Sequence, residues 1–308
     1  MMFAIPAFAV YVIAAQDLFG TGKASTLLKC LLWGATGAFI LSYLAEAALV
    51  SAGVGYATVV TLAAPVIEEA FKALLLVYLI RQPRFRYAVD GALYGFVVGI
   101  GFGIAESLVT YLSSSQGVLL ADTVSRTLTA VLMHAAASAL VGICLGRLRR
   151  ARAGRRLTST LPGIGLAMLS HLAYNNIAYS LDGHAEALLL FGVIFGASSV
   201  MAIFLLVRQE LDGEKARFST ALALDVGISA AERQAIQQLG DAAIEQALAE
   251  LGSALGERNT VLIRRMLIVQ ANIGILKNNL SYPASERLRK AWLDELAQLL
   301  AEAERIRR

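Results

Sequence analysis

Seven long apolar runs constrain the fold of this chain more than any other feature of its sequence. A helix of about 20 residues crosses the roughly 30 Å hydrocarbon layer of a bilayer, and most of the runs reach that length. Hydrophobic residues make up 57% of the chain and charged residues only 16%, which favours a membrane protein. The sequence therefore predicts an all-α, polytopic membrane helix bundle of about seven transmembrane helices, at residues 1–16, 30–50, 57–80, 88–112, 125–146, 160–180 and 185–207.

The charges between the runs predict how the spans are oriented. Lys and Arg gather at 17–29, 81–87 and 147–156. The intervening connections 51–56, 113–124 and 181–184 contain neither residue type. Because cytoplasmic loops carry an excess of Lys and Arg, we expect the basic connections inside. The chain is predicted to be a multi-pass protein of the cell membrane, with the N-terminus outside and the segment after Arg208 cytoplasmic.

Residues 208–308 have a different composition, with most of the Glu, Lys and Arg and no further span. Ser229 and Glu232 have the spacing of a helix capping box, and 286–306 is amphipathic with helical period. We expect two domains: a transmembrane helical domain at 1–207 and a soluble cytoplasmic helical domain at 208–308. The second domain is expected to be regulatory or to support a homo-oligomer.

Neither the net charge nor the cysteines indicate another class of partner. The net charge is +4, but the arginines of the first half lie in short loops, where they set topology. Nucleic acid is therefore not an expected partner, whereas the lipid bilayer is. Cys30 and Cys144 fall inside predicted spans without a CxxC spacing, so they are expected to be apolar packing residues.

The third span contains three charged residues, Glu68, Glu69 and Lys72, spaced so that they share one helix face. Ionisable groups in hydrocarbon are costly and usually face a protein interior or a wet cavity. Two adjacent carboxylates in a low dielectric repel each other's ionised form, and Lys72 neutralises only part of their charge. An acid and a base are therefore expected at one place, although a purely structural ion network remains an alternative.

Other spans also contain polar residues. These are Glu106, in the motif Phe102-x-x-x-Glu106, then His134, and finally His171 and Asn175, in the motif His171-x-x-x-Asn175. At about 1.5 Å per residue, Glu106, His134 and His171 lie roughly 9–14 Å below the outer surface, and the glutamate pair roughly 17–18 Å. We expect these groups to converge between the midplane and the outer leaflet. A lone buried histidine can also serve helix association alone. Five glycines of the fourth span permit close helix packing: Gly91, Gly95, Gly99, Gly101 and Gly103.

The combination Glu68-Glu69-x-x-Lys72, Phe102-x-x-x-Glu106, His134 and His171-x-x-x-Asn175 resembles the PrsW family of intramembrane proteases. That family is similar to the CAAX prenyl proteases and the bacteriocin-processing enzymes. The resemblance covers about residues 57–180 and keeps the order and helix placement of the motifs. The wider superfamily usually has Arg after its glutamate pair and His in the second motif, where this chain has Lys72 and Glu106. This is the PrsW-like variant, so a prenyl-protein substrate is not the expected one.

The resemblance implies a peptidase that cuts a membrane-protein substrate, such as an anti-sigma-factor-like single-span regulator. One mechanism needs no cofactor: Glu69 or Glu68 activates water, while His134 and His171 orient it and stabilise the oxyanion. The other places Zn²⁺ on His134, His171 and Glu106 and leaves Glu69 as general base. Lys72, Phe102 and Asn175 are expected to support the catalytic groups.

Two functions of other classes also fit the buried polar residues. A transporter or channel would use Glu, Lys and His as a proton or ion relay. A non-catalytic membrane sensor or scaffold would use the same cluster only to fix helix packing. Neither alternative requires a substrate to be cleaved.

Overall fold

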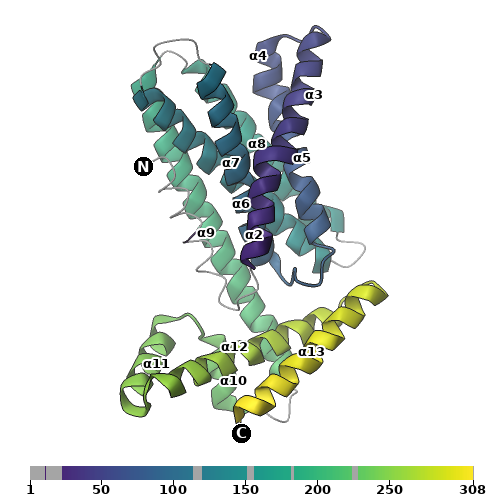
Figure 1. Cartoon of the computed structure of the whole chain (residues 1–308), viewed down its shortest axis with the longest axis vertical. Coiled ribbons are helices and arrows are strands. Elements are labelled where there is room, and N and C mark those ends of the chain that lie inside the picture. The colour runs from purple at the N-terminus through teal and green to yellow at the C-terminus, as the bar shows by residue number, and fades with distance from the viewer. Residues whose placement is uncertain are drawn as a thin grey trace. The chain divides into compact units, whose positions relative to one another are not determined.

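A computed structural model of the chain describes residues 11, 23–113, 120–150, 156–181, 184–223 and 228–307, and every regular element in these ranges is a helix (Figure 1). The chain divides into two compact units, which we describe separately. Unit 1 contains 22–81 and 87–207, and unit 2 contains 82–86 and 208–308.

Unit 1 has a described helix at six of the seven predicted spans, and only Tyr11 of the first predicted span lies within the described ranges. Several helices follow one another without a break, since η1 and η2 are short stretches of π-helix. The elements are α2 (Ala24–Trp33), η1 (Gly34–Ala38), α3 (Phe39–Ser51), α4 (Tyr56–Thr58), η2 (Val59–Ala63), α5 (Ala64–Leu79), α6 (Ala88–Ser113), α7 (Leu120–Arg150), α8 (Arg156–Ser180) and α9 (Ala185–Ala223).

Four helical stretches in the described part of the chain are long and apolar enough to cross a membrane. They are Ala24–Ser51, Ala88–Ser113, Thr129–Arg149 and Glu186–Arg217. Large apolar side chains on several of the helices point outward, among them Leu44 on α3, Leu74 on α5 and Ile194 on α9. Water would make such exposure unfavourable, whereas lipid would not. The predicted helical membrane bundle is confirmed.

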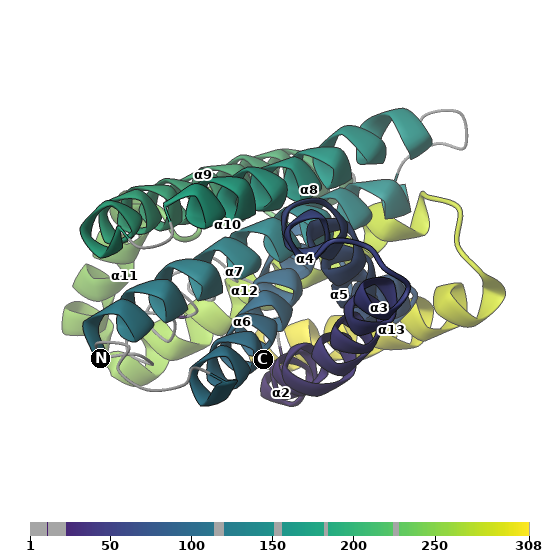
Figure 2. The same ribbon diagram turned by 90° about the horizontal axis from the view of Figure 1, so that it is seen from above.

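The innermost helices of unit 1 are α6 and α7, which run side by side (Figure 1 and Figure 2). In the apolar stretch of α7, 89% of the residues are buried, against 22% in that of α9. Glycines permit this close approach: a Cβ at Gly95 would overlap the carbonyl oxygen of Ser138, and a Cβ at Gly99 that of His134. The packing role predicted for these two glycines is confirmed. The contact brings the backbone that carries His134 directly against α6.

We expect Gly99→Ala to lower the free energy of unfolding by about 1–3 kcal/mol, because the added methyl group must push α6 away from α7. Denaturation of the purified protein in detergent measures the change. Gly165 on α8 is the matched control, since a Cβ there meets no atom within 4 Å. Equal stability of Gly99→Ala and Gly165→Ala would show that the α6–α7 contact tolerates a side chain.

Beyond α9, the regular elements of unit 2 in the described ranges are helices. Its helices are α10 (Ala230–Gln237), α11 (Ala242–Leu255), α12 (Glu257–Leu280) and α13 (Glu286–Arg307). The predicted capping box is confirmed, because Ser229 Oγ accepts from the Glu232 N–H at 3.1 Å and Glu232 Oε2 accepts from the Ser229 N–H at 2.7 Å. Both cysteines, which lie in unit 1, are buried and form no disulfide bond with each other, as expected for packing residues.

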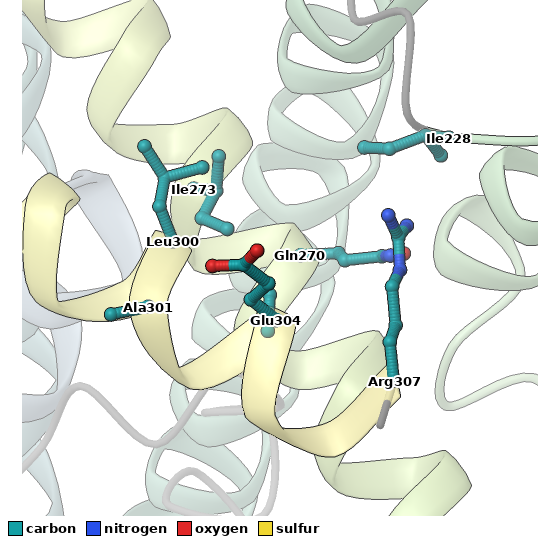
Figure 3. A pocket seen from close by; sticks show the side chains of 8 residues that line it. Ile228, Gln270, Ile273, Leu300, Ala301, Glu304 and Arg307 are labelled. Carbon is teal, nitrogen blue, oxygen red and sulfur yellow. The ribbon is translucent and has the colours of Figure 1, made fainter.

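The helices α12 and α13 pack against each other and enclose one side of a cavity of about 400 Å³ (Figure 3). Ile273 and Leu300 lie toward one side of this cavity, and Gln270 and Arg307 toward the other (Figure 3). Buried residues of α12 run without interruption from Val269 to Leu276. This helix is therefore the central element of unit 2.

Candidate active site and metal centre

Three charged side chains of α5 lie in the interior of unit 1. The exposed fractions of Glu68, Glu69 and Lys72 are 4%, 1% and 0%. Lys72 Nζ lies 2.5 Å from Glu69 Oε1 and 3.9 Å from Glu68 Oε2. A charge buried without a partner would be expensive, so the spacing of three residues that pairs Lys72 with Glu69 stabilises both. Glu68 has the ammonium group only at longer range.

Glu69 joins three helices of unit 1. Besides Lys72, its Oε1 atom accepts from His171 Nδ1 of α8 at 3.1 Å. Its Oε2 atom accepts from Ser138 Oγ of α7 at the longer distance of 3.4 Å. The carboxylate is thus held firmly through one oxygen and only weakly through the other.

Glu106 and Phe102 of α6 both contact His134 of α7. Glu106 Oε2 lies 2.7 Å from His134 Nε2, and the Phe102 ring centroid lies 5.0 Å from that of His134. Lys72 Nζ is 4.5 Å from the centre of the Phe102 ring, which is a cation–π distance, and 3.0 Å from His134 Nδ1. Phe102 therefore contacts both the lysine and the histidine.

The two hydrogen-bonded carboxylates select a tautomer for each histidine. A carboxylate only accepts hydrogen bonds, so we assign the ring hydrogens to His134 Nε2, facing Glu106, and to His171 Nδ1, facing Glu69. The other two nitrogens, His134 Nδ1 and His171 Nε2, then carry lone pairs, and that of His134 accepts from Lys72 Nζ at 3.0 Å. Each of them lies 3.7 Å from Glu68 Oε2. Three atoms with lone pairs, one from each of three helices, thus surround one point.

Glu68, His134 and His171 can hold a metal ion, because one ligand atom from each lies within 4.8 Å of the others. Within the described ranges, Glu68 Oε2 and His171 Nε2 are buried and have no hydrogen-bond partner. Two imidazoles and one carboxylate are a donor set that Zn²⁺ accepts at catalytic sites. Ligating histidines also usually donate their second N–H to a carboxylate, as both histidines do here. The residues present therefore fit a divalent cation.

This metal set differs from the one that the sequence predicted. The predicted third ligand was Glu106, which instead lies on the far nitrogen of His134 and orients the ring. Glu68 occupies the predicted place of Glu106 beside both histidines. Helix periodicity placed both acids near the site but did not show which one faces these lone pairs.

Asn175 and Asn176 of α8 fix the position of α5 at its start. Pro65 has no N–H, so it cannot donate a backbone hydrogen bond. In the π-helical pattern of η2 the acceptor would be the Val60 carbonyl, five residues back, and in an α-helix it would be the Thr61 carbonyl, four residues back. Asn175 Nδ2 donates to the Val60 carbonyl and Asn176 Nδ2 to that of Thr61, each at 3.0 Å. Asn175, one turn after His171 on α8, therefore forms a hydrogen bond to a neighbouring helical segment.

Some polar residues around the site were not among the residues predicted to form it. Ser138 lies one turn after His134 on α7, a spacing that would have indicated it. Trp33 Nε1 of α2 donates to the Phe71 carbonyl at 3.2 Å, beside Lys72. On α3, Ser42 Oγ and Glu46 Oε1 are one turn apart, and both are buried atoms without a hydrogen-bond partner among the described residues.

Comparison with known proteins gives one match. The profile of the PrsW family, described as PrsW family intramembrane metalloprotease, matches residues 22–207, which is more than half of the chain. No curated protein and no solved structure matches the chain. The matched region contains the glutamate pair, Glu106 and both buried histidines. By sequence match, the chain belongs to the PrsW family of intramembrane metalloproteases.

Proposed function

We propose that this chain hydrolyses a peptide bond of a membrane-protein substrate at the centre formed by Glu68, His134 and His171. The observation that carries the proposal is the convergence of three atoms on one buried point: His134 Nδ1, and Glu68 Oε2 and His171 Nε2, which have no hydrogen-bond partner among the described residues. A helix bundle gains no stability from leaving buried acceptors unpaired. Such an arrangement is reasonable where a cation and a reacting group occupy the point.

The three ligands of the proposed metal are Glu68, His134 and His171. A bound divalent cation would supply Lewis acidity, which polarises a carbonyl and makes water more acidic. Lys72 donates to His134 Nδ1, so the ammonium group competes with a cation for that lone pair. Its close pairing with Glu69 gives Lys72 another partner when the cation binds.

Glu69 is the proposed general base. Its Oε1 atom is occupied by Lys72 and His171, whereas its Oε2 atom has only the long bond from Ser138. Oε2 is therefore the atom at which Glu69 would take a proton from the attacking water and return it to the leaving amine. The two positively polarised partners on Oε1 hold the carboxylate in place while the proton moves.

Glu106 is proposed to fix the ring of His134 without touching the substrate. We expect Glu106→Gln to reduce metal affinity or the rate of cleavage by about 10- to 100-fold, the usual cost of losing a carboxylate behind a ligating histidine. Zinc titration and steady-state kinetics measure the two effects. If the variant binds metal and cleaves like the wild type, Glu106 has no role in the site.

The proposed substrate is a single-span membrane protein, such as an anti-sigma-factor-like regulator, cut toward the outer leaflet. The charge pattern of the loops, which places the basic connections in the cytoplasm, supports this side. In this orientation residues 208–308 form a cytoplasmic domain. Oligomerisation through that domain stays a prediction.

The test is cleavage of single-span substrates by the purified protein in liposomes, with the products identified by mass spectrometry. We expect one defined cut in the wild type and the same cut in His184→Ala, because His184 is exposed, whereas His134 and His171 are buried. A folded wild-type protein that cleaves no such substrate, but moves protons or ions across the liposome, would overturn the proposal in favour of a transporter.

A further inference from the structure

The five residues 82–86 belong to unit 2 by their packing, although the chain runs through them from α5 to α6. α5 carries the glutamate pair and ends at Leu79, and α6 carries Glu106 and begins at Ala88. A short connection thus links the two helices that supply the acidic residues of the site. Its own partners are residues of α12 and α13 in unit 2.

Arg86, at the end of this loop, is held by three residues of unit 2. Its guanidinium group donates to Asn272 Oδ1 and to Glu295 Oε1. Its carbonyl oxygen accepts from Asn279 Nδ2 at 3.0 Å. The residue is only 9% exposed, so the bonds form away from bulk water, where loss of one partner is costly. Arg86 is consequently fixed through both its side chain and its backbone.

The beginning of the loop is held independently. Trp292 Nε1 of α13 donates to the Pro83 carbonyl at 3.1 Å, and the tryptophan is 2% exposed. Between the two anchors, Phe85 is 1% exposed. Since both ends of the loop are attached to α12 and α13, these helices set its conformation and the distance between its ends.

The packing inside unit 1 leaves the alignment of α5 and α6 open to control by this loop. α6 packs most extensively along α7, and its direct contact with α5 is much smaller. The contact of Lys72 with the Phe102 ring and the approach of His134 to Glu68 both depend on that alignment. A shift of the loop would change these distances without breaking the α6–α7 contact.

We infer that Arg86 and Trp292 are positioning residues, through which the domain at 208–308 aligns the Glu68–Glu69 helix with the Glu106 helix. The inference rests on the proposed function and assigns the C-terminal domain a role in it. The domain acts on the site through the peptide chain of the loop, so it needs no residue in the site itself.

The first experiment compares kinetics of Arg86→Ala and Arg265→Ala in the full chain. Arg265 pairs with Glu302 at 2.7 Å between α12 and α13 but does not contact the loop, so it is the matched control. We expect Arg86→Ala to lower kcat by about 10- to 100-fold with little change in KM, since a misplacement of about 1 Å can cost 10²-fold. Arg265→Ala should cleave like the wild type.

The second experiment measures the alignment itself, by pulsed electron paramagnetic resonance between spin labels at Leu74→Cys and Leu108→Cys. Both positions are exposed, on α5 and α6, and the background carries Cys30→Ala and Cys144→Ala. We expect the distance distribution to broaden in Arg86→Ala and in Trp292→Ala, and to stay narrow in Arg265→Ala. If Arg86→Ala does not fold, Glu295→Gln replaces it, because this change keeps the shape of the partner.

The two readouts separate this inference from the proposed function. If the distance distribution broadens in the variants but the wild type cleaves no substrate, the positioning role is supported and the proposed peptidase activity is contradicted. An unchanged distance distribution in Arg86→Ala and Trp292→Ala, with an unchanged kcat in Arg86→Ala, would overturn the positioning role, even if the wild type is an active peptidase.

Discussion

Replacement of Glu69 by glutamine is expected to lower kcat by about 10²–10⁴-fold, the range found when a general base is lost. Glutamine keeps the size of the side chain, and its carbonyl oxygen can still accept from His171 Nδ1. It cannot take a proton at physiological pH. The expected result is therefore a protein that retains its fold, its substrate affinity and its metal, and that turns over slowly.

The neighbouring change, Glu68→Gln, is the natural comparison. Glu68 Oε2 faces both imidazole lone pairs, so this variant should lose metal as well as activity. Glu69 faces Lys72 and His171 Nδ1, so its variant should not. Metal analysis of the two purified proteins, side by side with single-turnover kinetics, separates a ligand from a base.

Three results would contradict this assignment. If Glu69→Gln loses metal and Glu68→Gln retains it, the roles are exchanged. Equal metal content with equal loss of activity would mean that both carboxylates act on water. Cleavage at the wild-type rate in a folded Glu69→Gln protein would leave Glu69 as a structural partner of Lys72 only.

Local patterns in the sequence predicted much of this site. The spacing of Glu68, Glu69 and Lys72 placed them on one face of a helix, and that face is buried. Similar estimated depths in the bilayer placed Glu106, His134 and His171 in one layer, and the structure brings them together. Period and depth are properties of single helices, so one sequence was enough to infer them.

The orientation of each side chain within that layer depends on contacts between helices. Which nitrogen of His134 faces the centre is decided by Glu106 on the other nitrogen, and no spacing in α7 encodes this. The hydrogen bond from Asn175 to the Val60 carbonyl depends on the π-helical stretch η2, which precedes Pro65. Such details require the tertiary structure.

The loop at 82–86 shows the same limit at longer range. Its basic residues predicted a cytoplasmic connection, and nothing in the local sequence indicated that it would pack with α12 and α13. The partners of Arg86 lie 186 and 209 residues further along the chain. Periodicity and capping signals extend over one or two helical turns, so they carry no information about such pairs.

Removal of metal is the second large effect that we expect. Treatment with a strong chelator should reduce cleavage to the background, because Glu68, His134 and His171 then no longer hold the cation that polarises the scissile carbonyl and the attacking water. Addition of Zn²⁺ in a small excess should restore the rate. The wild type and His184→Ala should each bind one ion per chain, and His171→Ala should bind less than one.

Stability provides a readout of metal binding that does not depend on cleavage. A ligand that binds only the folded state stabilises it by RT ln(1 + [L]/Kd), which is about 2.7 kcal/mol at a hundredfold excess over Kd. The Tm of the wild type should therefore rise with Zn²⁺, and the Tm of His171→Ala should not. His184→Ala controls for a histidine that binds zinc nonspecifically.

The opposite result has an equally definite meaning. A chelated protein that contains no metal and cleaves at the full rate would show that the site works without a cofactor. In that case Glu68 Oε2, which lacks a hydrogen-bond partner among the described residues, would become the atom that takes the proton from water. His134 Nδ1 and His171 Nε2 would then orient that water, and Glu68→Gln would abolish cleavage without changing the Tm measured in Zn²⁺.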